Sequence, residues 1–292
     1  MPGQPETSSL LRETKRRLSR LRRFARKSLG QHFLIDAAVL EKIIAAAELT
    51  LDDTVIEVGP GLGVLTRELA GRAGKVVAVE LDEGLAAALK EEMTSLGNVT
   101  VVNEDILKAG TASLLAGRTD YKVVANLPYY ITAAVLRHFL SVQPRPRLMV
   151  LMLQKEVAEA IATSGGNSGL LANSVRFYGW PSIVAVVPAA SFYPAPQVDS
   201  AVIKIDVYPR AAIEVSSEGD FFKFLKAAFS TRRKQLPNAL SRGLGVAKDK
   251  VLAWLEAAAI EPQRRAESLS LEEWERLWRQ FEAFGESGRD KA

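Results

Sequence analysis

The pattern of hydrophobic and polar positions predicts alternating strands and helices over most of the chain. Short apolar runs rich in valine and isoleucine have the length of buried strands; we expect them at residues 54–58, 75–79, 99–102, 121–125, 148–153, 183–187 and 201–207. Between these runs apolar residues recur at helical spacing, with Asp36 and Asp82 placed to cap two helices. Strands that are apolar on both faces and alternate with helices indicate a parallel sheet covered on both sides.

The pattern changes after Pro209. Residues 216–219 read as a linker, and everything beyond them has helical periodicity, ending in a capping box at residues 270–273. We therefore expect an α/β domain over residues 27–210 and a small all-α domain over residues 216–284. Residues 1–26 form a basic extension that we expect to be flexible.

Composition removes several classes of site. The 292 residues are 48% hydrophobic and 25% charged, which is typical of a globular protein. The chain has no cysteine and only two histidines, which excludes disulfides and thiol nucleophiles and argues against a metal site. No apolar run is long enough to span a bilayer. We expect a soluble, cytoplasmic protein.

Positive charge is concentrated in two blocks. Residues 1–30 hold nine basic and two acidic side chains and therefore carry a charge of +7. Because the net charge of the whole chain is +4, the remaining residues carry −3. Residues 221–242 hold six basic side chains and no acidic one. Two such blocks on a mildly acidic body suggest a polyanion partner. A solvated tail and an exposed helix face explain the charges equally well.

A glycine-rich turn follows the first predicted strand of the sheet. Residues 55–63 read Val-Ile-Glu-Val-Gly-Pro-Gly-Leu-Gly, and glycines there let backbone amides approach a ligand at the carboxyl end of the strand. The dinucleotide motif needs its third glycine at position 64, which holds valine. The spacing suits S-adenosylmethionine, which has no phosphate to bind, better than NAD.

Polar residues at two further strand ends support a nucleoside site. Glu80 ends the second strand and could accept hydrogen bonds from both ribose hydroxyls, while Asp105 could accept from an adenine amine, with Ile106 against the ring. Either carboxylate alone is more often a solvated loop residue. At successive strand ends they favour a binding site.

The fourth strand leads into Asn126-Leu127-Pro128-Tyr129-Tyr130. An adenine amine is a poor nucleophile because its lone pair is delocalised into the ring. The Asn126 side-chain carbonyl and the Leu127 backbone carbonyl could accept the two amine hydrogens and hold that lone pair toward a methyl group. Tyr129 could stack on an extruded base. The motif alone does not separate adenine in DNA, adenine in RNA and a glutamine amide, and a buried Pro-Tyr turn is the alternative.

Several stretches together resemble one family, the ribosomal RNA adenine dimethyltransferases of the KsgA (RsmA) type. The similarity rests on residues 27–34, 57–63, 80, 105–106, 126–130, 152–158, 192–202 and 229–240. It implies a seven-stranded Rossmann-like, class I methyltransferase domain that uses S-adenosylmethionine, followed by a helical rRNA-binding domain. The implied reaction is N6,N6-dimethylation of two adjacent adenosines near the 3′ end of small-subunit (16S) rRNA, with a role in small-subunit biogenesis.

The resemblance also implies roles for individual residues. It assigns the cofactor to Gln31, His32, Leu34, Gly59, Gly61, Glu80, Asp105, Ile106 and Asn126, and the target amine to Asn126, Leu127, Pro128 and Tyr129. Tyr129 and Phe192 would stack on the base, although from the residues alone Phe192 is more often a packing anchor. RNA would be bound by Lys223, Lys226, Arg232, Arg233 and Lys234. The implied partner is small-subunit rRNA or a pre-30S particle, bound by a monomer without metal or membrane.

Three other functions stay open at this point. One is the relative that methylates an adenosine of large-subunit rRNA and confers macrolide resistance. The second is a non-enzymatic RNA-binding assembly factor on the same fold, which the intact Glu80, Asp105 and Asn126 disfavour. The third is a dehydrogenase, disfavoured by Val64.

Overall fold

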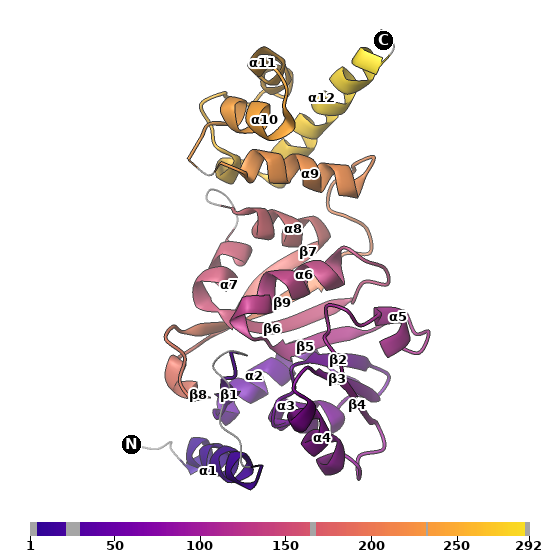
Figure 1. Ribbon diagram of the computed structural model, residues 1–292, viewed down its shortest axis with the longest axis vertical. Coiled ribbons are helices and arrows are strands. Elements are labelled where there is room, and N and C mark those ends of the chain that lie inside the picture. The colour runs from indigo at the N-terminus through magenta and orange to yellow at the C-terminus, as the bar shows by residue number, and fades with distance from the viewer. Residues whose placement is uncertain (1–4, 22–29, 164–167, 232, 290–292) are drawn as a thin grey trace. The chain divides into compact units, whose positions relative to one another are not determined.

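The computed structural model describes residues 5–21, 30–163, 168–231 and 233–289 (Figure 1). The chain divides into two compact units, residues 1–159 with 180–209 and residues 160–179 with 210–292. No helix in the described part of the chain is both long enough and apolar enough to cross a membrane.

The first unit is built on a seven-stranded sheet with the order β4-β3-β2-β5-β6-β9-β7. The strands are β2 (Thr54–Val58), β3 (Lys75–Glu80), β4 (Val99–Asn103), β5 (Lys122–Asn126), β6 (Leu148–Gln154), β7 (Gly179–Val187) and β9 (Ser200–Val207). β2, β3, β4, β5 and β6 run parallel to one another, as predicted. The prediction is wrong for β9, which is antiparallel to β6, because an apolar run shows that a strand is buried but not its direction.

Helices cover both faces of this sheet (Figure 1). On one face, α2 (Ala37–Ala47) and α3 (Val64–Ala70) pack on buried strand residues, and α4 (Glu83–Glu92) packs against β3 and β4. On the other, α6 (Thr132–Leu140) places Phe139 against Tyr121. The remaining short helices here are α5 (Thr111–Leu114) and α7 (Lys155–Ala162). The predicted caps are confirmed: Asp36 accepts from two amides of α2 and Asp82 from two amides of α4.

A two-stranded antiparallel sheet joins two distant segments beside the main sheet. β1 (Phe33–Leu34) pairs with β8 (Phe192–Tyr193), with Leu34 opposite Phe192. The adjoining 3₁₀ turns are η2 (Tyr129–Ile131) and η3 (Ala189–Ser191). Two of the stretches that carried the family resemblance, 27–34 and 192–202, therefore meet through β1 and β8.

The N-terminal extension, which we expected to be flexible, contains helix α1 (Pro5–Arg20). Leu18 is buried in a cluster with Phe33, Leu62 and Leu85. Arg17 donates from Nη1 to the backbone oxygen of Leu62 at 2.6 Å. The sequence showed the charge of this segment, whereas its packing depends on surfaces that are remote in the chain.

The second unit is helical and has an aromatic core. Its helices are α8 (Leu170–Tyr178), α9 (Glu218–Phe229), α10 (Leu236–Leu244), α11 (Lys248–Ala257), η4 (Ala266–Ser268) and α12 (Leu271–Arg289). Trp274 and Trp278 are buried in it, as expected, and the capping box is formed reciprocally by Ser270 and Glu273. Residues 160–179, which we assigned to the α/β domain, belong here because Phe177 of α8 stacks on Phe221 of α9 at 5.4 Å.

Candidate active site

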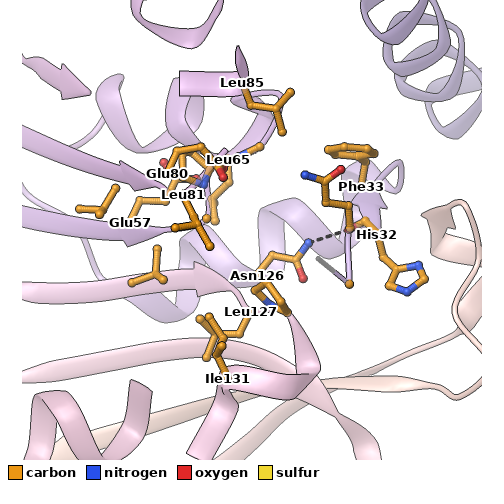
Figure 2. Close-up of a pocket in the computed structure, with 18 of the residues that line it drawn as sticks. His32, Phe33, Glu57, Leu65, Glu80, Leu81, Leu85, Asn126, Leu127 and Ile131 are labelled. Atoms are coloured by element: carbon orange, nitrogen blue, oxygen red, sulfur yellow. Dashed lines mark hydrogen bonds between the residues drawn. The ribbon is translucent and has the colours of Figure 1, made fainter. Parts of the chain in front are cut away.

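One pocket opens at the carboxyl ends of β2, β3 and β5 in the first unit (Figure 2). β2 lies between β3 and β5 in the sheet. After β2 the chain forms β3 and β4 on one side and then crosses to β5 on the other, so the crevice lies at the point where the strand order reverses. The pocket is lined by every residue predicted for the cofactor, amine and base-stacking sites: Gln31, His32, Leu34, Gly59, Gly61, Glu80, Asp105, Ile106, Asn126, Leu127, Pro128, Tyr129 and Phe192. Their individual roles stay predictions.

The glycine-rich turn is fixed on Glu80. The amide of Gly61 donates to Glu80 Oε2 at 3.0 Å, and the amide of Asp82 donates to Oε1 at 2.9 Å. Gly61 has a φ of +57°, and a Cβ there would lie 3.2 Å from the ring of Phe33, so glycine is required. A carboxylate has about four lone-pair sites, so Glu80 can also accept from a ribose hydroxyl.

The charge of the pocket selects the kind of ligand. Four acidic side chains line it, those of Glu57, Glu80, Glu104 and Asp105, and no lysine or arginine is among the described lining residues. A ligand with phosphates would meet uncompensated negative charge, whereas a cation is favoured. The apolar walls include Leu85 and Ile106, both buried, which suits an adenine ring. The residues present therefore fit S-adenosylmethionine, a nucleoside with a sulfonium cation.

Glu57 is a pocket residue that we did not assign from the sequence. It is the last residue but one of buried strand β2 with 1% exposure, and its Oε2 has no hydrogen-bond partner among the described residues. Burial raises the pKa of Glu57 to about 8, and the nearby charge of Glu80 adds to this rise. The sequence did contain a signal for this residue. An acidic side chain inside an otherwise apolar strand, two positions before the turn, is costly to bury unless a partner or a ligand compensates it.

Asn126, at the end of β5, has a fixed amide orientation. Its Nδ2 donates to the backbone oxygen of His32 at 3.1 Å, as the dashed line in Figure 2 shows. A carbonyl oxygen can only accept, so the nitrogen must face His32 and Oδ1 is left as the acceptor of the side chain. The next residue is also held, because the amide of Leu127 donates to Met152 O at 3.1 Å.

Tyr129 is held by its hydroxyl and by one face of its ring. Its hydroxyl forms a 2.8 Å hydrogen bond with Ser200 Oγ, a fully buried residue. Its ring stacks on the His32 ring with centroids 5.9 Å apart and planes inclined by 24°. His32 Nδ1 in turn donates to Pro194 O at 2.7 Å. Tyr129 thus lies on a wall whose parts come from three separate segments of the chain.

The remaining predicted site residues are either buried in the core or exposed on the surface. Phe192 is 3% exposed and belongs to the main hydrophobic core, so its observed contacts are those of a packing residue. In the second unit Lys223, Lys226, Arg233 and Lys234 are exposed, and Lys223 forms an ion pair with Asp220 at 2.8 Å. Arg232 lies outside the described residues.

Comparison with known proteins gives the family. The sequence model of the family described as ribosomal RNA adenine dimethylase matches residues 22–282. The chain belongs to this family. It is therefore an S-adenosylmethionine-dependent rRNA adenine dimethyltransferase. Curated relatives named ribosomal RNA small subunit methyltransferase A include those of Dehalococcoides mccartyi strain 195, 55% identical over 93% of each chain, and Moorella thermoacetica, 46% identical over 85% of this chain and 90% of the relative.

Solved structures of the same class support the fold. A dimethyladenosine transferase from Plasmodium falciparum is 26% identical, with a TM-score of 0.73, and the match covers 87% of this chain and 98% of that one. The 23S rRNA methyltransferase ErmE is 28% identical with a TM-score of 0.68, over 86% of this chain and 99% of that one. The predicted class I methyltransferase fold with a C-terminal helical region is confirmed.

Proposed function

We propose that this enzyme dimethylates N6 of two adjacent adenosines near the 3′ end of small-subunit rRNA, in the cytoplasm, where rRNA is modified. The observation that carries the proposal is the orientation of Asn126. With Nδ2 bonded to His32 O, Asn126 offers an oxygen at the end of β5, in the same pocket as the carboxylates suited to the donor.

The residues of the chain act mainly by positioning. Asn126 Oδ1 and the Leu127 carbonyl accept the two hydrogens of the adenine amine, which draws the nitrogen toward tetrahedral geometry and localises its lone pair. Pro128 orders the turn, and Tyr129, held by Ser200, supports the base by stacking. When bound, S-adenosylmethionine supplies an electrophilic methyl group. The adenine nitrogen loses its proton only after attack, so water can take it and no strong base is needed.

The donor site is assigned to the carboxylates and the turn. Glu80, already fixed by two amides, accepts from the ribose hydroxyls. Asp105 accepts from the donor's adenine amine, with Ile106 against the ring. Gln31, His32 and Leu34 complete the site from the segment that includes β1, and the glycines at 59 and 61 allow the backbone to approach.

The RNA surface is assigned to exposed basic residues of the second unit. Lys226, Arg233 and Lys234 are exposed cations of the second unit, and Lys223, although paired with Asp220, is 81% exposed. We include Arg232 from the sequence alone. Phosphate contacts of this kind add affinity without selecting a base sequence.

Small-subunit rRNA is favoured over large-subunit rRNA by the relatives. Those named for the small subunit are 43–55% identical, whereas the large-subunit enzyme ErmE is 28% identical. We expect a single chain to suffice, because all the residues assigned to the site come from one chain.

The decisive experiment measures transfer of tritiated methyl groups to three substrates: unmethylated small-subunit particles, naked 16S rRNA and large-subunit particles. We expect transfer to the small-subunit substrates only, and dimethyladenosine at adjacent positions by primer extension. Asn126→Ala should lose transfer by at least about a hundredfold at saturating donor, and Asn238→Ala, an exposed asparagine of α10, should behave as wild type. Transfer to large-subunit particles alone, or full activity of Asn126→Ala, would overturn the proposal.

A further inference from the structure

Helix α1 lies outside the residues that define the family. The family match begins at residue 22, and α1 ends at Arg20. Its inward side chains nevertheless pack against the donor pocket: Leu18 lies in a cluster with Phe33, Leu62 and Leu85, and all three of those residues line the pocket. A helix outside the family match thus lies directly behind a wall of the pocket.

Arg17 is the polar link between α1 and the glycine-rich turn. Its Nη1 donates to Leu62 O at 2.6 Å, and Leu62 lies between Gly61 and Gly63, which have φ values of +57° and +74°. A turn with these glycines has many accessible conformations, so holding it in one is entropically costly. The bond from Arg17 restrains this turn from outside the pocket, while Gly61 N is held by Glu80 from inside.

The guanidinium of Arg17 is itself held by two carboxylates. It pairs with Glu13 of α1 at 2.5 Å and with Glu92 of α4 at 3.1 Å, and Glu92 also pairs with Arg67 of α3 at 2.5 Å. The Arg17 side chain is only 14% exposed. Bonds of this kind are stronger when they are charge-assisted and shielded from water, so the position of Arg17 is well determined.

We propose that α1 forms the outer support of the donor pocket and that Arg17 is a positioning residue, which holds the glycine-rich turn in the conformation that binds S-adenosylmethionine. The inference rests on the proposed assignment of this pocket to the donor. Arg17 does not touch the donor in this proposal. Arg17 changes the affinity for the donor. A contact that stabilises the bound ground state and the transition state equally leaves kcat unchanged.

The test is donor affinity without RNA, measured by isothermal titration calorimetry on the full chain. Arg17→Met should weaken S-adenosylmethionine binding about tenfold, the lower end of the contribution of a hydrogen bond to a charged group. Arg16→Met removes the same charge from an exposed position of the same helix and should bind within about twofold of wild type. Arg17→Lys, which keeps the charge, should recover part of the affinity.

Two further measurements separate positioning from general destabilisation. The amides of residues 59 and 61–64 should exchange hydrogen faster in Arg17→Met than in Arg16→Met, and steady-state kinetics should show a higher KM for the donor with kcat unchanged. Leu18→Asp, which undocks α1 through its apolar contact, should give the same weaker binding. These variants address the helix even if Arg17→Met folds poorly.

The outcomes distinguish this inference from the proposed function. If wild type binds S-adenosylmethionine but Arg17→Met and Leu18→Asp bind it as tightly as Arg16→Met does, α1 does not support the pocket and only this inference fails. If wild type does not bind the donor, or if Glu80→Ala leaves its binding unchanged, the assignment of the pocket fails and both proposals fall.

Discussion

Glu57→Gln should make the stability of the protein less dependent on pH. The ordinary pKa of a glutamate is 4.5, and burial in β2 raises the pKa of Glu57 to about 8. Between these two values the folded chain holds a proton that the unfolded chain has released. The free energy of unfolding therefore falls as pH rises through this window, and the loss is complete above the folded pKa.

The size of the effect follows from the two pKa values. One pKa unit corresponds to about 1.36 kcal/mol, so full ionisation of Glu57 in the folded protein costs about 5 kcal/mol. Between about pH 6 and pH 8.5 the part of this cost that develops is about 2–3 kcal/mol. The amide that replaces the carboxyl in Glu57→Gln cannot ionise. The wild type should therefore lose about 2–3 kcal/mol more stability than this variant over the same range, and any effect of the substitution that does not depend on pH cancels in this comparison.

The assay is urea-induced unfolding followed by circular dichroism at both pH values. Glu91→Gln, at an exposed position of α4, is the control and should follow wild type. A cationic ligand favours the charged form of Glu57, so donor affinity should also rise with pH in wild type and less so in Glu57→Gln. If the wild type and Glu57→Gln lose the same stability within about 0.5 kcal/mol, Glu57 is not held protonated and the reasoning is refuted.

Three further predictions follow from single contacts. Ser200→Ala removes the hydroxyl that holds Tyr129 in place and should lower kcat/KM on rRNA about fivefold. Ser191→Ala should leave kcat/KM unchanged. Gly63→Ala places a Cβ 2.3 Å from a leucine methyl at a φ of +74°, and should destabilise by about 1–3 kcal/mol in urea unfolding. Lys122→Met leaves a buried aspartate with a half-exposed arginine as its remaining cationic partner and should cost about 1–3 kcal/mol in the same unfolding assay.

Controls for these variants are present in the chain. Ser191 is also buried, like the serine of the amine site, but bonds to the cap of α2, so equal losses in both serine variants would contradict a specific role in the site. Gly97→Ala meets no atom within 4 Å, and a larger loss there than at Gly63 would contradict the steric argument. An unchanged unfolding midpoint in Lys122→Met would show that the buried ion pair contributes nothing.

The sequence predicted most of the local structure because that structure depends on neighbours in the chain. Apolar runs gave the strands, and the caps at Asp36 and Asp82 are contacts within two or three residues. The acceptors at successive strand ends indicated a nucleoside pocket, because parallel strands bring their carboxyl ends together. The same local reasoning could not give the direction of β9, since a buried strand is equally apolar either way.

Tertiary structure decided what depends on contacts between distant segments. The orientation of Asn126 is set by His32, 94 residues away, and the packing of α1 by Leu62, 45 residues from Arg17. The pKa of Glu57 depends on complete burial of its carboxyl, which no residue pattern measures. The sequence by itself determined which residue types are present for methyl transfer. The folded chain alone decided which atoms they present, because hydrogen-bond direction and desolvation are properties of three-dimensional surroundings.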